Sequence, residues 1–335
     1  MNIPSRTFFL RRPAAALALL FGALGATHAA EEKFVFLTNW YAQAEHGGFY
    51  QALATGMYKQ AGLDVTIKMG GPNMNIMQLI AAGQADCVMG SSDALVLRNR
   101  EQGVPVVTVA ASMQKDPQGI VAHPGVKKIE ELKDKTILIS TGSYNTFWPW
   151  LKAKYGLADT QTRPYAFNLQ PFAADTNVVQ QGYVTYDPYA VDAALKFKPQ
   201  FFLFSDYGWP NYGSTIICME QTIKERPQAV AAFVKASMQG WKNYLTGDAT
   251  AANTMIKKDN PNMTDGQIAF AMGALKERGL VMGGDAATKG IGIMTEERLK
   301  KTFDMMVEMK LIDPGKVDFK RTFTTQFVKD IKVTP

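Results

Sequence analysis

Apolar residues recur along the chain with two different spacings. Residues 63–69, LDVTIKM, place an apolar side chain at every second position, which is the period of a strand with one buried face. Residues 47–61 instead place Phe49, Leu53 and Met57 four positions apart, as on one face of a helix. These two patterns predict that strands and helices alternate along the chain.

The alternation is regular over the first hundred residues or so. Strands are expected at residues 33–39, 63–69, 85–90 and 104–111, and helices at 47–61, 75–83 and 91–103. Strands joined by helices favour a largely parallel sheet with helices on both faces. This part of the chain therefore predicts one α/β unit.

A second unit of the same kind follows. Its strands are expected at residues 119–123, 135–141, 182–187 and 199–204, and its helices at 127–134 and 142–157. One more strand, 214–220, then precedes four helices at 227–245, 249–258, 265–279 and 295–311. This order predicts that the second unit is inserted into the first, with chain crossings near residues 111–118 and 206–213.

The fold expected from this order is α/β with two lobes and a cleft between them. A chain of 335 residues exceeds the size at which one core keeps growing, which also favours two domains. Lobe 1 is assigned to residues 30–113 plus 214–335, and lobe 2 to residues 114–213. The methionine stripe of the last helix, Met305, Met306 and Met309, is expected to pack against lobe 1.

The N-terminus predicts export. Three arginines precede an apolar run that ends in a small-residue cleavage pattern, so residues 1–29 are interpreted as a signal peptide and the mature protein as periplasmic. The pair Arg11 and Arg12 leaves twin-arginine export open beside the general secretory route. No cysteine follows the apolar run, which disfavours a lipoprotein anchor.

Charge and cysteine content narrow the class of protein further. The formal charge of +6 falls to about +3 without the signal peptide, and no basic run remains, so nucleic acid is not expected as a partner. Cys87 and Cys218 lie in apolar, strand-like segments and are interpreted as two buried thiols, with a disulfide as the alternative in an oxidising compartment. No residue spacing suggests a metal site, and no cofactor is expected.

The order of several motifs carries a family resemblance. An aromatic pair is followed by HGGFYQA, GLDV, MQLIAAGQAD, GSSDALVLRNREQGVPVV, STGS and GYVTYDPYAVD. In this order and spacing the mature chain resembles the periplasmic solute-binding proteins of ABC importers, in the branch of thiamine-pyrimidine-precursor and sulfonate or nitrate receptors. The resemblance implies a periplasmic-binding-protein fold (type II-like) with two crossovers and a ligand cleft between the lobes.

The junction after the first strand is the first candidate for ligand contact. Trp40 and Tyr41 offer flat apolar faces, and adjacent glycines would let a ligand approach the backbone. The alternatives are that Trp40 is a core aromatic and that His46 caps a helix. The candidates here are Asn39, Trp40, Tyr41, His46, Gly47 and Gly48.

Two hydroxyl-rich loops lie at equivalent points, each between a strand and a helix. Hydroxyls and free backbone N–H groups at a helix start suit anions or carbonyl oxygens, although serine and threonine cap helices in any protein. The candidates are Ser91, Ser92, Thr141, Ser143, Tyr144 and Asn145.

Two single residues complete the predicted site. Asp187 precedes a proline that favours a helix start, and in the resembled receptors an acidic residue at this place contacts the ligand. Its alternative role is to cap that helix. Trp209, in the second crossing, is placed either over a bound ring or in packing between the lobes.

These residues predict the ligand class. The candidate loops hold aromatic rings, hydroxyls and one carboxylate but no arginine or lysine, which favours a planar nitrogen heterocycle such as an aminopyrimidine or thiamine precursor. The alternative is a sulfonate or aromatic carboxylate held by helix N-termini and serines.

The expected role is that of a receptor and not of an enzyme. The resembled superfamily includes a thiamine-pyrimidine synthase with a cysteine-rich motif, but this chain has two separate cysteines and none of the common hydrolase or nucleotide-binding motifs. The resemblance implies a monomer that closes on a small-molecule ligand by hinge motion and delivers it to an ABC importer permease.

Overall fold

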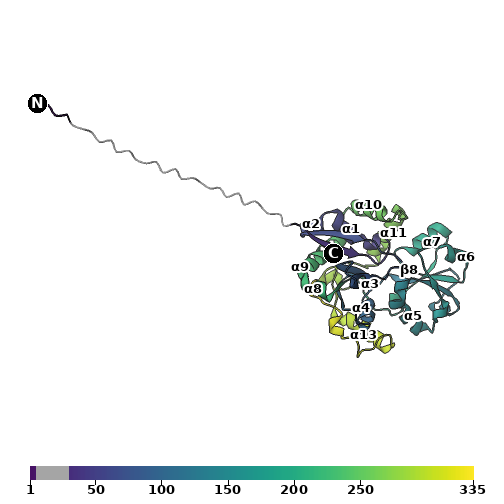
Figure 1. Ribbon diagram of the computed structural model, residues 1–335. Helices are drawn as coiled ribbons and strands as arrows, with labels where there is room; N and C mark the ends of the chain where they lie inside the picture. Colours follow the sequence, from purple (N-terminus) through teal and green to yellow (C-terminus); the bar gives the residue numbers. More distant parts are fainter. Residues whose placement is uncertain (5–29) are drawn as a thin grey trace. The chain divides into compact units, whose positions relative to one another are not determined.

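The computed structural model describes residues 1–4 and 30–335, and residues 31–335 form one compact unit (Figure 1). The predicted signal peptide therefore lies almost wholly outside the described residues. Within the described part of the chain, no helix has the length and apolar character needed to cross a membrane.

The first of two five-stranded sheets has the strand order β2-β1-β3-β10-β4. Its strands are β1 (Glu32–Leu37), β2 (Leu63–Lys68), β3 (Cys87–Ser92), β4 (Val106–Met113) and β10 (Gly213–Met219). β1 runs parallel to β2 and β3, whereas β10 is antiparallel to both of its neighbours, β3 and β4. β1, β2, β3 and β4 therefore run in the same direction, as the prediction of a largely parallel sheet requires, and β10, which enters from the second chain crossing, is the exception.

The second sheet has the order β7-β6-β8-β5-β9. Its strands are β5 (Gln118–Ala122), β6 (Thr136–Ile139), β7 (Thr162–Pro164), β8 (Val178–Tyr183) and β9 (Gln200–Leu203). β6 is parallel to β7 and β8, and β5 is antiparallel to β8 and β9. All strands of this sheet fall between two strands of the first sheet, so the chain passes between the sheets twice, at residues 113–118 and 203–213.

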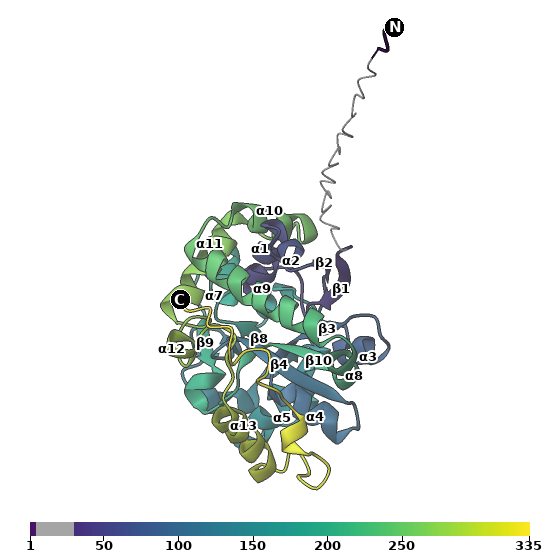
Figure 2. The same cartoon turned by 90° about the vertical axis from the view of Figure 1, so that its left-hand side faces the viewer.

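Helices cover both sheets. Those between strands are α1 (Gly47–Ala54), α2 (Met57–Gln60), α3 (Ile76–Ala81), α4 (Ala94–Glu101), α5 (Phe147–Tyr155), α6 (Gln170–Ala174) and α7 (Asp187–Leu195). The C-terminal helices are α8 (Glu220–Glu225), α9 (Pro227–Thr246), α10 (Thr250–Asp259), α11 (Asp265–Glu277), α12 (Ala286–Lys289) and α13 (Glu296–Glu308). α5, α6 and α7 group with the second sheet, and α9 lies alongside α1 (Figures 1 and 2).

Several boundaries differ from the predicted ones. The helix predicted over residues 47–61 breaks at Gly56, whose φ of 72° is left-handed. The strand predicted over 182–187 is β8, which begins and ends four residues earlier, because Val184–Tyr186 make a turn before α7 and not a strand. β7 and α6 are absent from the prediction.

The methionine stripe of α13 does not pack only against the first sheet's helices. Met306 is buried among Ala94 and Leu97 of α4 and among residues that include Trp148 of α5. Met305 and Met309 are half-buried against the same cluster. The prediction that this stripe packs lobe 1 is therefore incomplete, since Met306 belongs to a cluster that also contains a helix lying between two strands of the second sheet.

Cys87 and Cys218 form a disulfide, so the interpretation as two free thiols is wrong. They are directly opposite each other on the antiparallel neighbours β3 and β10, with Cα atoms 4.3 Å apart. Such a spacing is typical of a facing pair on antiparallel strands. The sequence pattern could not reveal this register, because it depends on the reversed direction of β10.

Candidate ligand-binding pocket

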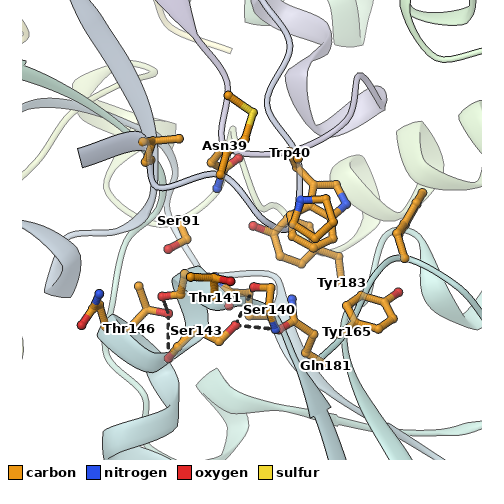
Figure 3. Close-up of a pocket in the computed structure, with 18 of the residues that line it drawn as sticks. Asn39, Trp40, Ser91, Ser140, Thr141, Ser143, Thr146, Tyr165, Gln181 and Tyr183 are labelled. Atoms are coloured by element: carbon orange, nitrogen blue, oxygen red, sulfur yellow. Dashed lines mark hydrogen bonds between the residues drawn. The ribbon is translucent and has the colours of Figure 1, made fainter. Parts of the chain in front are cut away.

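One pocket lies where strands of both sheets reach their carboxyl ends (Figure 3). Loops after β1 and β2 and the end of β3 form one wall, and the loops after β6, β7 and β8 form the other. The space free of protein atoms, including the open mouth, is about 930 Å³. Carboxyl ends of strands are the usual ligand position in open α/β sheets.

One part of the pocket is aromatic. Trp40 and Tyr165 have nearly parallel rings, with an interplanar angle of 17° and centroids 6.1 Å apart. Phe167 stands edge-on to Trp40, with centroids 5.9 Å apart, and its ring lies 4.9 Å from that of Tyr186. Phe167 has a φ of 58°, a left-handed conformation that is uncommon for an aromatic residue. A strained backbone thus positions this ring, as is frequent at binding sites.

Another part of the pocket is rich in hydroxyl groups. Gln181 Oε1 accepts hydrogen bonds from the Ser140 backbone N–H at 2.5 Å and from Ser143 Oγ at 2.6 Å. Ser140 Oγ and Ser143 Oγ are 2.9 Å apart and also hydrogen-bonded. These bonds join the end of β8 to the loop after β6, which forms the 3-10 helix η3 (Thr141–Asn145). The loop is therefore held in place without any ligand.

Among the described residues that line the pocket, Asp187 is the one with a carboxylate. It is buried, and it accepts hydrogen bonds from the Tyr183 N–H at 2.8 Å and from Gln180 Nε2 at 3.2 Å. Desolvation outweighs these two bonds and raises the pKa of Asp187 to about 7. No arginine, lysine or histidine is among the described residues that line the pocket. The wall is therefore neutral or weakly acidic near neutral pH.

A second buried carboxyl connects the two sides of the molecule. Glu45 lies in the 3-10 helix η1 (Ala44–His46) after β1, and Thr185 Oγ1, in the turn before α7, donates a hydrogen bond to it. Burial raises the pKa of Glu45 to about 6. Its negative charge in turn contributes to the raised pKa of Asp187.

Comparison with known proteins places this fold and pocket in a family. The family model described as "NMT1/THI5 like" matches residues 43–251, which span most of the pocket. The chain belongs to the NMT1/THI5-like family.

Two relatives of this NMT1/THI5-like chain are binding proteins by name. It is 23% identical over 264 residues to the formylaminopyrimidine-binding protein of Halalkalibacterium halodurans, covering 72% of this chain and 76% of the relative. It is 24% identical over 295 residues to the riboflavin-binding protein RibY of Chloroflexus aurantiacus, covering 84% and 81%.

The fold of this family member is that of periplasmic binding proteins. A similar solved structure is the alkanesulfonate-binding protein SsuA from Xanthomonas axonopodis pv. citri bound to MOPS, with a TM-score of 0.64 and 13% identity. The match covers 89% of this chain and 99% of that one. The resemblance to periplasmic solute-binding proteins and the two-sheet α/β fold are thereby confirmed.

Half of the predicted site residues line the pocket of this NMT1/THI5-like chain. These residues are Asn39, Trp40, Ser91, Thr141, Ser143, Asn145 and Asp187. Asp187 is the first residue of α7 and its carboxylate reaches back to Tyr183, so it does not cap that helix. Ser91 lies inside β3, and the residue before α4 is Asp93, so Ser91 does not cap a helix either.

The adjacent glycines do not line the pocket, which corrects the prediction that they admit a ligand. A Cβ atom on Gly47 would lie 2.1 Å from the ring of Tyr244, and one on Gly48 would lie 2.2 Å from the ring of Trp241. Both rings belong to α9. The two glycines therefore allow α1 to pack closely against α9.

The other five predicted residues also lie away from the pocket lining. His46 is fully buried, and burial lowers its pKa to about 3, so it is neutral and presents no charge to a ligand. Tyr41 packs against Phe167 with ring centroids 5.5 Å apart. Ser92 is buried at the end of β3.

Tyr144 and Trp209 both point to other parts of the chain. Tyr144 is 41% exposed, and its hydroxyl is hydrogen-bonded to Thr162 Oγ1 at 2.8 Å. Trp209 is buried against Trp150, and its Nε1 donates to Asp116 Oδ2 at 2.8 Å. Of the two alternatives for Trp209, a place over a bound ring or a packing role, its position matches the packing role.

The sequence prediction missed several lining residues, among them Gln118, Ser140, Tyr165, Phe167, Gln181 and Tyr183. Tyr165 and Phe167 follow β7, a three-residue strand too short to give a period. Ser140 and Gln181 carried a usable signal. Each comes at the point where a run of apolar residues gives way to polar ones, ILIST and VVQQGY, which marks the carboxyl end of a buried strand.

Proposed function

We propose that this protein is the extracytoplasmic receptor of an ABC importer and that it captures a small planar nitrogen heterocycle of the aminopyrimidine or thiamine-precursor type. The observation that carries the proposal is the composition of the pocket wall. Stacked and edge-on aromatic rings, uncharged hydrogen-bonding groups and one buried carboxyl suit a flat, neutral ring with polar edges. The names of the two relatives, which bind a formylaminopyrimidine and riboflavin, support the same class.

The proposed location is the periplasm. It rests on the predicted signal peptide, residues 1–29, and on the fold shared with periplasmic binding proteins. A disulfide between Cys87 and Cys218 suits that compartment, because disulfides persist in oxidising environments. A permease is the proposed partner, and a monomer the proposed state.

Binding without turnover fits the pocket better than catalysis. The synthase-like alternative would need reactive cysteine or histidine side chains at the site. Both cysteines of the sequence are used in the disulfide, and His46 is buried away from the lining with a strongly lowered pKa. Asp187, the one carboxyl on the described wall, has both oxygens engaged by protein donors.

We further propose that the two halves close around the ligand by a hinge at the two connections. The connections are tied to each other, since Trp209 in one donates to Asp116 in the other. They are also anchored to neighbouring helices. Asp93, at the start of α4, accepts from Asn211 and Tyr212, and Arg298 of α13 donates to the Gln114 carbonyl. A firmly held joint allows the lobes to swing as rigid bodies.

Calorimetric titration of the mature protein tests the ligand class. Aminopyrimidines, thiamine precursors and flavins are compared with alkanesulfonates and aromatic carboxylates. Tight binding of a ring compound that weakens at least tenfold in Trp40→Ala, with Tyr144→Phe as a control outside the pocket, is the expected result. Binding of sulfonates or carboxylates alone, unaffected by Trp40→Ala, would make the anion receptor the correct reading.

A further inference from the structure

The free hydrogen-bonding groups of the pocket are unevenly distributed. Near the aromatic rings, both oxygens of Asp187 already accept bonds from the protein. Around the loop after β6, the side chains of Ser91, Thr141 and Asn145 line the pocket and have no side-chain hydrogen bond within residues 1–4 and 30–335. Figure 3 shows Ser91, Thr141 and Ser143 grouped together, on the other side of the pocket from Tyr165. Ser91, Thr141 and Asn145 thus form a group of unused polar side chains away from the rings, while Asn39 Oδ1, beside Trp40, is a further lining atom without a hydrogen-bond partner in the described residues.

The loop after β6, which carries Thr141 and Asn145, is held in place by hydrogen bonds to β8. Gln181 Oε1 binds both the backbone of Ser140 and the hydroxyl of Ser143. Thr146 Oγ1 adds a further bond to the Gly142 carbonyl at 3.3 Å. Because the loop is already ordered, a ligand that binds Thr141 or Asn145 does not have to order it, and preorganisation of this kind favours affinity.

The same part of the pocket carries no positive charge. The described lining includes no arginine, lysine or histidine. Arg98 and Lys152 line a separate hollow together with Tyr144, and each has a protein partner there, the Leu311 carbonyl and Asp159 respectively. Phosphate is bound most strongly by arginine or lysine, so a phosphorylated group would lack its usual partner.

We infer that the ligand has two parts, a heteroaromatic ring held beside Trp40, Tyr165 and Phe167, and a short uncharged hydroxylated tail or sugar held by Ser91, Thr141 and Asn145. This inference rests on the proposed receptor function and names its ligand class more narrowly. Hydroxyl groups of such a tail both donate and accept, as do the side chains that they would meet. A nucleoside or a ring with a sugar-alcohol chain has this form.

Calorimetric titration with matched sets of compounds tests the tail. Each set has one ring in three forms: bare, with a neutral sugar or sugar-alcohol tail, and with that tail phosphorylated. Lumichrome, riboflavin and riboflavin phosphate form one set, and cytosine, cytidine and cytidine monophosphate another. We expect the neutral tailed form to bind at least about tenfold more tightly than the other two forms, as two or three added hydrogen bonds would give.

Variants of the loop locate the effect. Thr141→Val keeps the shape of the side chain but removes its hydroxyl, and Asn145→Ala removes the amide. Each should weaken the tailed form several-fold and leave the bare ring unchanged. Tyr144→Phe, which removes a hydroxyl of the same loop that faces Thr162, is the matched control and should change neither.

The possible results separate the two proposals. If bare rings bind as tightly as tailed ones, or phosphorylated tails bind more tightly, the inference about the tail is wrong and the receptor function stands. If no ring compound of either set binds and alkanesulfonates do, the proposed ligand class fails and the inference fails with it.

Discussion

Reduction of the disulfide between Cys87 and Cys218 should destabilise the protein substantially. The two cysteines are 131 residues apart, and the bond closes a loop that holds the whole second sheet. In the chain-entropy model a loop of this length restricts the unfolded chain by about 5 kcal/mol of free energy. That value is comparable to the total stability of many domains.

Urea unfolding of the mature protein, with and without a reductant, measures this effect. The oxidised protein should have a higher midpoint, and the free energy of unfolding should fall by several kcal/mol on reduction. The double variant Cys87→Ala/Cys218→Ala is the control, and its midpoint should not respond to the reductant. Because both cysteines are buried, thiol labelling is carried out in denaturant. Without prior reduction it should detect no free thiol, since the two sulfur atoms are bonded to each other.

Two results would refute this reasoning. Equal midpoints with and without reductant would mean that the bond does not restrict the unfolded chain as calculated. Two reactive thiols in the unreduced, unfolded protein would mean that the cysteines are not bonded, as their sequence context first suggested.

Three further predictions concern packing, pH and the connections. Gly48→Ala should lower the free energy of unfolding by about 1–3 kcal/mol, because its Cβ would overlap the buried ring of Trp241, whereas Gly273→Ala in α11, with open space around it, should not destabilise. Equal effects in urea unfolding would contradict the packing explanation. The pKa of Asp187 is raised from 3.8 to about 7, so the native state binds more protons than the unfolded state over this range. The contribution of Asp187 to the free energy of unfolding therefore falls as the pH rises from about 4 to 7. Urea midpoints of Asp187→Asn should therefore fall less over that range than those of the natural protein, and parallel curves would count against it. Trp209→Phe should cost about 1–3 kcal/mol by leaving a buried oxygen of Asp116 without its donor, and this loss should shrink in an Asp116→Asn background, where an unchanged loss would point to packing alone.

Most of the order of strands and helices, with β7 and α6 as exceptions, and both chain crossings could be predicted because they depend on local apolar periods. The direction of β10 could not, since the same alternation fits a parallel or an antiparallel strand. One error followed from that unknown. Cys87 and Cys218 were interpreted as two buried thiols, whereas the antiparallel pairing of β3 with β10 places them opposite each other.

In the site as well, roles that depend on local sequence could be predicted, whereas roles that depend on a distant part of the chain could not. Trp40, Thr141 and Asp187 line the pocket, and each was singled out because it lies at or directly after the end of a predicted strand. Gly47 and Gly48 do not, because the partner that requires them to be small is α9, about 190 residues later in the chain. The sequence alone does not show whether a pair of glycines makes room for a ligand or for a neighbouring helix.

The hydrogen bond between Trp209 and Asp116 has a mechanical consequence. Two independent connections would let one half of the molecule tilt, twist and slide against the other. Under the proposed hinge closure, connections tied together and anchored through Asp93 and Arg298 would act as a single joint with few directions of movement. A ligand that touched both walls would then need to stop only one rotation, and a permease would meet one of two shapes, occupied or empty.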